Sequence, residues 1–79
     1  MPRLSISRQA GQLLVARRKA LGLSQSQVAV GLGISQNRLS EIEAHPERLT
    51  LDRLISLAGL LGLELVLQEK TPASDTGEW

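Results

Sequence analysis

The sequence predicts an all-α domain of four helices followed by one short β-strand. Apolar residues recur at helical spacing in four segments, which are separated by glycine or proline. From residue 63 to residue 68 the period changes, and leucines occupy alternate positions. The length of 79 residues is enough for a single domain with one small core, so self-association is also expected.

The four helices are expected at residues 7–21, 25–32, 36–44 and 51–62. Each begins at or just after a residue whose hydroxyl can accept a hydrogen bond from the first turn: Ser7, Ser24, Ser35 and Thr50. Three of them end at a glycine, the residue that most readily adopts the left-handed conformation: Gly22, Gly33 and Gly62. Pro46 follows the third helix and prevents it from continuing.

Gly33 separates the second and third helices. A chain that leaves one helix and starts another at a steep angle within a few residues needs a positive φ, which glycine adopts without steric cost. Ile34 would then fill the corner, and Leu39 and Ile42 would face inward from the third helix. This arrangement predicts a helix-turn-helix.

The fourth helix is expected to lie mostly in the core. Its apolar stripe consists of Leu51, Leu54, Ile55, Leu57, Ala58 and Leu61. Gly59 in its interior costs about 1 kcal/mol relative to alanine, which indicates close packing at that point.

Residues 63–68 predict a half-buried strand, and the alternative is that the fourth helix continues past Gly62. Because no second strand is expected, the partner would be the same strand of another copy, paired antiparallel about a two-fold axis. The residues of this dimer strand are Leu63, Leu65, Val66 and Leu67. The domain therefore spans residues 1–69, and the polar tail at 70–79 is expected to be disordered.

The charge is distributed unevenly along the chain. Six of the nine basic residues lie in residues 1–40, which contain no acid, and all eight acids follow. This distribution favours a surface that meets an anion on one side, although ordinary solvated helix faces are the alternative. The chain has no Tyr or Phe and only one Trp, so it lacks the stacking platforms for unpaired bases. A nucleic-acid partner should be a duplex.

Several classes of function find no support in the residues. Without cysteine there are no disulfides or thiolate metal sites, and His45 stands alone, so neither an enzyme nor a metal or cofactor is expected. No apolar run reaches the roughly 20 residues that cross a bilayer, and the N-terminus lacks a signal-peptide pattern. The expected location is the cytoplasm, with no membrane partner.

The polar residues of the predicted motif indicate double-stranded DNA as the partner. In a helix-turn-helix the second of the two helices lies in the major groove, where Gln and Asn bind adenine and Arg binds guanine. The predicted base-reading residues are Ser35, Gln36, Asn37, Arg38 and Glu41. The predicted phosphate-binding residues are Ser24, Gln25, Gln27, Arg17 and Lys19. For each residue the alternative is a solvated helix face.

The stretch "LGLSQSQVAVGLGISQNRLSEIE" resembles the helix-turn-helix of the phage Cro and repressor type, also called the XRE family. The resemblance runs from about Arg17 to Leu61 and implies the four-helix lambda-repressor-like fold. It also implies a buried ion pair between a late arginine of the first helix and the glutamate that ends the third, here Arg18 and Glu43. Such a pair would tie the two helices together.

The stretch "IEAHPERLTLDRLISLAGLLGLELVLQEK" is similar to the end of HipB-type antitoxins, in which a strand after the last helix pairs with its dimer mate. This similarity implies a bacterial homodimer that binds a palindromic operator, represses its own promoter and neutralises a HipA-type serine/threonine kinase toxin. Trp79 would be either a docking anchor for the toxin or part of a disordered end. One alternative is a stand-alone XRE-type transcriptional regulator without a toxin. Another is an interaction module that inhibits a kinase and contributes little DNA affinity.

Overall fold

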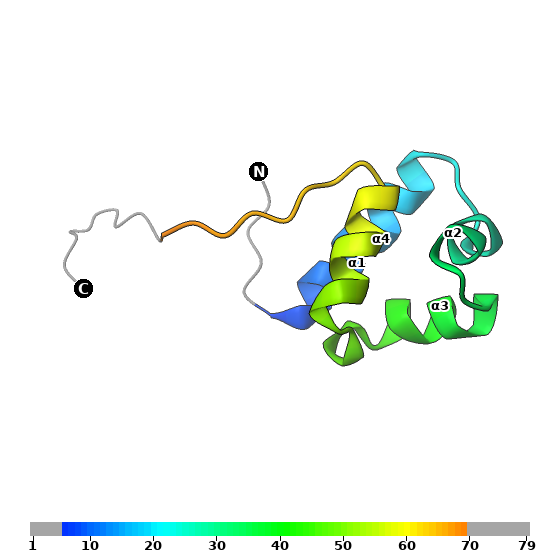
Figure 1. Cartoon of the computed structure of the whole chain (residues 1–79), viewed down its shortest axis with the longest axis horizontal. Helices are drawn as coiled ribbons and strands as arrows, with labels where there is room; N and C mark the ends of the chain where they lie inside the picture. The colour runs from blue at the N-terminus through cyan, green and yellow to red at the C-terminus, as the bar shows by residue number, and fades with distance from the viewer. Residues whose placement is uncertain (1–5, 70–79) are drawn as a thin grey trace.

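The computed structural model describes residues 6–69 and contains four α-helices. These are α1 (Ser7–Ala20), α2 (Gln25–Leu32), α3 (Gln36–Ala44) and α4 (Leu51–Leu60), with a short 3-10 helix η1 (Pro46–Arg48) between α3 and α4. Figure 1 shows α2 almost end-on and α3 from the side, so their axes cross steeply. The all-α, four-helix prediction is therefore confirmed, with bounds close to those expected.

Three of the four predicted hydroxyl caps are present. Each accepts a hydrogen bond from the backbone N–H three residues later at 3.0–3.1 Å: Ser24, Ser35 and Thr50. The prediction for Ser7 is wrong, because Ser7 lies inside α1 and Ile6 precedes the helix. The N–H of Ile6 instead donates to the side-chain oxygen of Gln9 at 3.2 Å. Each hydroxyl cap contributes about 1 kcal/mol to its helix.

Gly33 ends α2 in the left-handed conformation, with φ +73° and ψ +31°. Its N–H donates to the carbonyl of Val30 at 3.1 Å, and the N–H of Ile34 donates to the carbonyl of Ala29 at 3.0 Å. No atom lies within 4 Å of the position that a Cβ would take at Gly33. The glycine is therefore required by backbone conformation and not by crowding.

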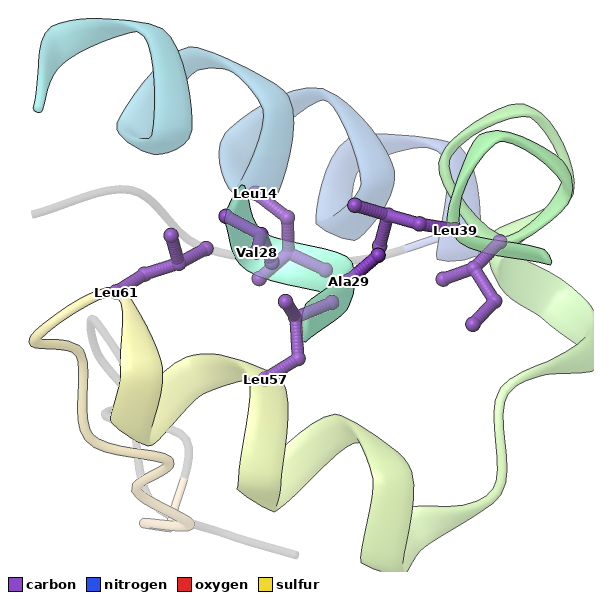
Figure 2. Close-up of a cluster of buried hydrophobic side chains, with 7 residues drawn as sticks. Leu14, Val28, Ala29, Leu39, Leu57 and Leu61 are labelled. Atoms are coloured by element: carbon purple, nitrogen blue, oxygen red, sulfur yellow. The ribbon is translucent and has the colours of Figure 1, made fainter. Parts of the chain in front are cut away.

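All four helices contribute to one hydrophobic core, most of which Figure 2 shows as sticks. Its buried members are Leu14, Val28, Ala29, Leu39, Ile42, Leu57 and Leu61. Leu39 has no exposed surface, and Ile42 is 6 % exposed. Since these two residues anchor the apolar face of α3, as predicted, the polar face of that helix is left outward.

The prediction that α4 is mostly core is only partly right. Leu57 and Ala58 are buried, whereas Leu51 and Ile55 are 64 % and 49 % exposed. Helical spacing identifies which residues share a face, but no element formed by residues 6–69 covers the part of α4 that carries Leu51 and Ile55. This apolar surface of α4 lies open within the described chain.

The close packing expected at Gly59 is also wrong. Nothing lies within 4 Å of the position of a Cβ at Gly59. The contact between α4 and α2 is instead at Gly31, where a Cβ would stand 3.0 Å from Cδ2 of the Leu60 side chain.

The chain after α4 leaves the helices, as the gold and orange segment in Figure 1 shows. Gly62 has a φ of +71°, so the alternative in which α4 continues past it is wrong. Residues 63–69 form neither helix nor strand within the part of the chain that the structure describes. The predicted strand would take its partner from a second copy, so its pairing stays a prediction. The tail at 70–79, including Trp79, lies outside the described residues.

Replacing Gly33 by alanine should lower the free energy of unfolding by about 1–2 kcal/mol, because a side chain is disfavoured in the left-handed conformation. Gly59→Ala is the matched control. It adds the same methyl group to an exposed helix interior and should stabilise the protein by up to about 1 kcal/mol. Urea unfolding at one protein concentration measures both. A shift of the same sign in both variants would contradict the role of Gly33.

Candidate nucleic-acid interface

The outward face of α3 presents polar side chains to solvent. All of the predicted base-reading residues are exposed: Ser35, Gln36, Asn37, Arg38 and Glu41. The hydroxyl of Ser35 accepts the hydrogen bond from the N–H of Arg38, and this bond begins the helix. Asn37 follows in the first turn. The arrangement offers amide, guanidinium and hydroxyl groups at the start of one short helix, a form that enters a major groove.

The amino end of α2 contacts the first turn of α3. The Ser26 hydroxyl donates to Oε1 of Gln36 at 3.0 Å, and Nε2 of Gln36 lies 3.4 Å from Oε1 of Gln25. The backbone N–H groups of Gln25 and Ser26 have no acceptor within residues 6–69. Unpaired N–H groups at a helix amino end attract phosphate oxygens.

Two of the predicted phosphate-binding residues form a capping box at the start of α2. The N–H of Gln27 donates to the Ser24 hydroxyl at 3.1 Å, and the N–H of Ser24 donates to Oε1 of Gln27 at 2.8 Å. These bonds hold the first turn of α2 in a fixed shape. They therefore also fix where the free N–H groups of that turn are placed.

Arg18 and Glu43 form a buried ion pair that joins α1 to the end of α3. Nε of Arg18 donates to Oε2 of Glu43 at 2.7 Å, Nη2 donates to Oε1 at 3.2 Å, and each side chain is about 10 % exposed. Nη1 of Arg18 donates to the carbonyl of Leu23 at 2.9 Å. Nε2 of Gln25 donates to Oε1 of Glu43 at 2.8 Å. Both charged groups thus have additional hydrogen bonds, as burial requires.

Arg17 takes no part in the contacts around the Arg18–Glu43 pair. Its Nε donates to the carbonyl of Leu61 at 2.8 Å, at the carboxyl end of α4, where a cation stabilises the helix dipole. Lys19 is exposed on α1. Arg38 and Glu41 form an exposed pair at 3.4 Å, which contributes little to stability because water screens both charges.

Two contacts of the amino end of α2 were not predicted from the sequence. Ser26 bonds Gln36 across ten positions, and Gln25 bonds Glu43 across eighteen. Both contacts exist because α2 and α3 cross, which places the amino end of α2 beside Gln36 in the first turn of α3 and beside Glu43 near the end of that helix. The sequence shows that Ser26 carries a hydroxyl next to Gln25, but only the tertiary structure shows that this hydroxyl contacts Gln36.

Residues 6–69 hold no group of three or more His, Cys, Asp or Glu residues that could bind a metal ion. None of the helices they form has both the length and the apolar character needed to span a bilayer.

The family model described as helix-turn-helix matches residues 14–68, a span that includes α2, α3 and α4. The chain belongs to this family. This helix-turn-helix is of the XRE type, so the resemblance predicted from the sequence is confirmed. The chain is a DNA-binding helix-turn-helix protein. No curated protein matches the sequence.

This XRE-type protein is also similar to a solved structure, the HipB-O1-O2 complex. The TM-score is 0.79 and the sequence identity is 25%, and the match covers 87% of this chain and 100% of the HipB chain. The similarity therefore extends over the whole helical domain.

Replacing Glu43 by glutamine should destabilise the XRE-type protein by about 3–5 kcal/mol, because the charge of Arg18 would remain buried without its partner. Glu41→Gln makes the same chemical change in an exposed pair and should cost less than about 1 kcal/mol. Thermal and urea unfolding measure both variants. Equal losses would show that the buried pair has no special role in stability.

Proposed function

We propose that this protein is the antitoxin of a HipBA-like toxin–antitoxin module. It binds a palindromic operator as a homodimer, represses its own promoter and neutralises a kinase toxin, and it does so in the bacterial cytoplasm without enzymatic activity. The observation that supports this most strongly is the similarity to HipB in its complex with O1 and O2, which we take to be operator sites. The exposed polar turn of α3 supports the DNA-binding part independently.

On DNA, the first turn of α3 enters the major groove. Gln36 and Asn37 each offer an amide that can bind N6 and N7 of adenine, and Arg38 can bind O6 and N7 of guanine. Ser35 and Glu41 lie beside them, where a carboxylate can accept a bond from N4 of cytosine. The apolar face of α3 is held by the core, so only this polar face is available to the bases.

The amino end of α2 holds the phosphate backbone. Its free N–H groups at Gln25 and Ser26, together with the side chains of Ser24 and Gln27, lie next to the reading turn of α3. Lys19 adds attraction over a longer range. Nε of Arg17 donates to the carbonyl of Leu61, and a phosphate contact through the rest of its guanidinium stays a prediction.

A homodimer would place two copies of α3 in successive major grooves, about 34–36 Å apart on one face of the duplex. Exposed apolar side chains on α4 and on the segment that follows it support this assembly: Leu51, Ile55, Leu65, Val66 and Leu67. A small chain gains stability when a second copy covers such a surface, at about 25 cal/mol per Å² of apolar area.

Neutralisation of a kinase rests on the similarity to HipB alone. The test is co-expression with the product of the adjacent gene, followed by purification and a kinase assay. Association with a kinase whose activity falls on binding supports the antitoxin, and Trp79→Ala then tests the tail as its anchor. Operator binding without any such partner would favour the stand-alone regulator. Kinase inhibition without operator binding would favour the interaction module.

Asn37→Ala should weaken binding to the operator by about 1–3 kcal/mol and relax the preference at one base position per half-site, because a bidentate amide contact is lost. A gel shift with the upstream intergenic DNA and its single-base variants measures this. Gln12→Ala, an exposed substitution on α1, is the control and should bind as the wild type does. If affinity for every sequence fell equally, Asn37 would be a backbone contact and not a base reader.

Leu65→Pro should shift the protein from dimer towards monomer, since proline cannot donate the ladder hydrogen bond of a paired strand. Leu65→Ala removes most of the same side chain but keeps the N–H, and it should weaken the dimer less. Sedimentation over a range of concentrations distinguishes the two. A dimer that persists in Leu65→Pro would place the interface elsewhere.

A further inference from the structure

Gln36 lies on the exposed first turn of α3, yet both polar atoms of its amide have partners in α2. Its Oε1 accepts from the Ser26 hydroxyl at 3.0 Å. Its Nε2 is directed at Oε1 of Gln25 at 3.4 Å. The side chain is therefore held between two neighbours before any ligand is present.

The direction of the Gln36 amide follows from the buried ion pair. The carboxylate of Glu43, which is paired with Arg18, can only accept hydrogen bonds, so Gln25 must turn Nε2 towards it. This leaves Oε1 of Gln25 facing Gln36, which must present Nε2 to it. The remaining atom, Oε1 of Gln36, then faces Ser26, whose hydroxyl supplies the proton. In the reverse orientation two acceptor oxygens would face each other.

We propose that Ser26 is a positioning residue for DNA recognition, which acts by holding the Gln36 amide in the orientation that Gln25 sets. A primary amide has two N–H donors and two lone pairs on oxygen. After the bonds to Gln25 and Ser26, one N–H and one lone pair remain, and these are the groups that N7 and N6 of adenine require. The proposal rests on the proposed function, in which Gln36 reads a base.

Pre-orientation has a thermodynamic consequence for affinity and selectivity. A glutamine side chain that is free in solution must be ordered on binding, whereas this one is already ordered. A glutamine whose amide can rotate by 180° presents donor and acceptor in either order, and it then tolerates a base with the opposite pattern. The acceptor oxygen of Gln25 disfavours this second orientation, and the hydroxyl of Ser26 adds the hydrogen bond that keeps the side chain in the first.

The competing role for Ser26 is a direct contact with phosphate, since it lies at the amino end of α2. The two roles differ in their effect on sequence preference. Loss of a phosphate contact lowers affinity for all sequences alike, whereas loss of a positioning residue changes the preference at the base that Gln36 reads.

The test compares full-length Ser26→Ala, Ser26→Thr, Gln36→Ala and the double variant on the wild-type operator duplex and its single-base variants. Ser56→Ala, an exposed substitution on α4, is the matched control. In Ser26→Ala, discrimination at the base read by Gln36 should fall about 2- to 10-fold, the factor that corresponds to one net hydrogen bond. Ser26→Thr retains a hydroxyl and should restore it. In the Gln36→Ala background, Ser26→Ala should have no further effect.

Three results would overturn the role of Ser26 while leaving the proposed function intact. They are unchanged discrimination in Ser26→Ala, an equal loss of affinity on every sequence, and additive losses in the double variant. A wild-type protein with no base preference at all would instead overturn the proposed function, and this role with it.

A measurement on the free protein gives a second test that does not depend on DNA. The order parameter of the Gln36 side-chain amide, from ¹⁵N relaxation, should be high in the wild type and in Ser26→Thr and lower in Ser26→Ala. Equal order in all three would show that Ser26 does not hold Gln36.

Discussion

The bidentate ion pair between Arg18 and Glu43 is the interaction on which the arrangement of the motif depends. Two buried charges lose their hydration, and this loss is compensated only when their remaining hydrogen-bonding groups are also satisfied. Here Leu23 supplies a carbonyl to the guanidinium, and Gln25 supplies an amide to the carboxylate. The pair therefore joins the end of α1, the end of α3 and the start of α2, the three places that set the position of the reading turn.

The functional surface follows from this junction and from the turn at Gly33. The turn makes α2 and α3 cross steeply, the core holds Leu39 and Ile42, and the polar face of α3 is left outward beside the amino end of α2. The family match and the similarity to the HipB-O1-O2 complex agree with such a surface. A domain of this size buries only part of its apolar surface, and apolar side chains on α4 stay exposed. Contact with a second copy would cover them.

The elements that could be predicted from the sequence are those determined within a few residues of the chain. Caps such as Ser24 and the left-handed Gly33 depend on local backbone geometry, and the helix bounds followed from them. The exposure of Ile55 could not be predicted, because periodicity identifies a shared face without showing what covers it. The contact of Ser26 with Gln36 could not be predicted either, because it depends on how α2 and α3 cross. The pairing of residues 63–68 depends on a second molecule, and no pattern within one chain can provide its partner.

The ion pair between Arg18 and Glu43 should stay intact while the first turn of α3, which it positions, meets DNA. The most direct test is an NMR titration of the full-length protein with its operator duplex, following backbone amides together with the Nε–H signal of Arg18. Large shifts are expected at Gln25, Ser26 and residues 35–38, with the Arg18 signal still protected and nearly unmoved. Shifts confined to α4 or to the start of α1, or loss of the Arg18 signal on binding, would contradict it.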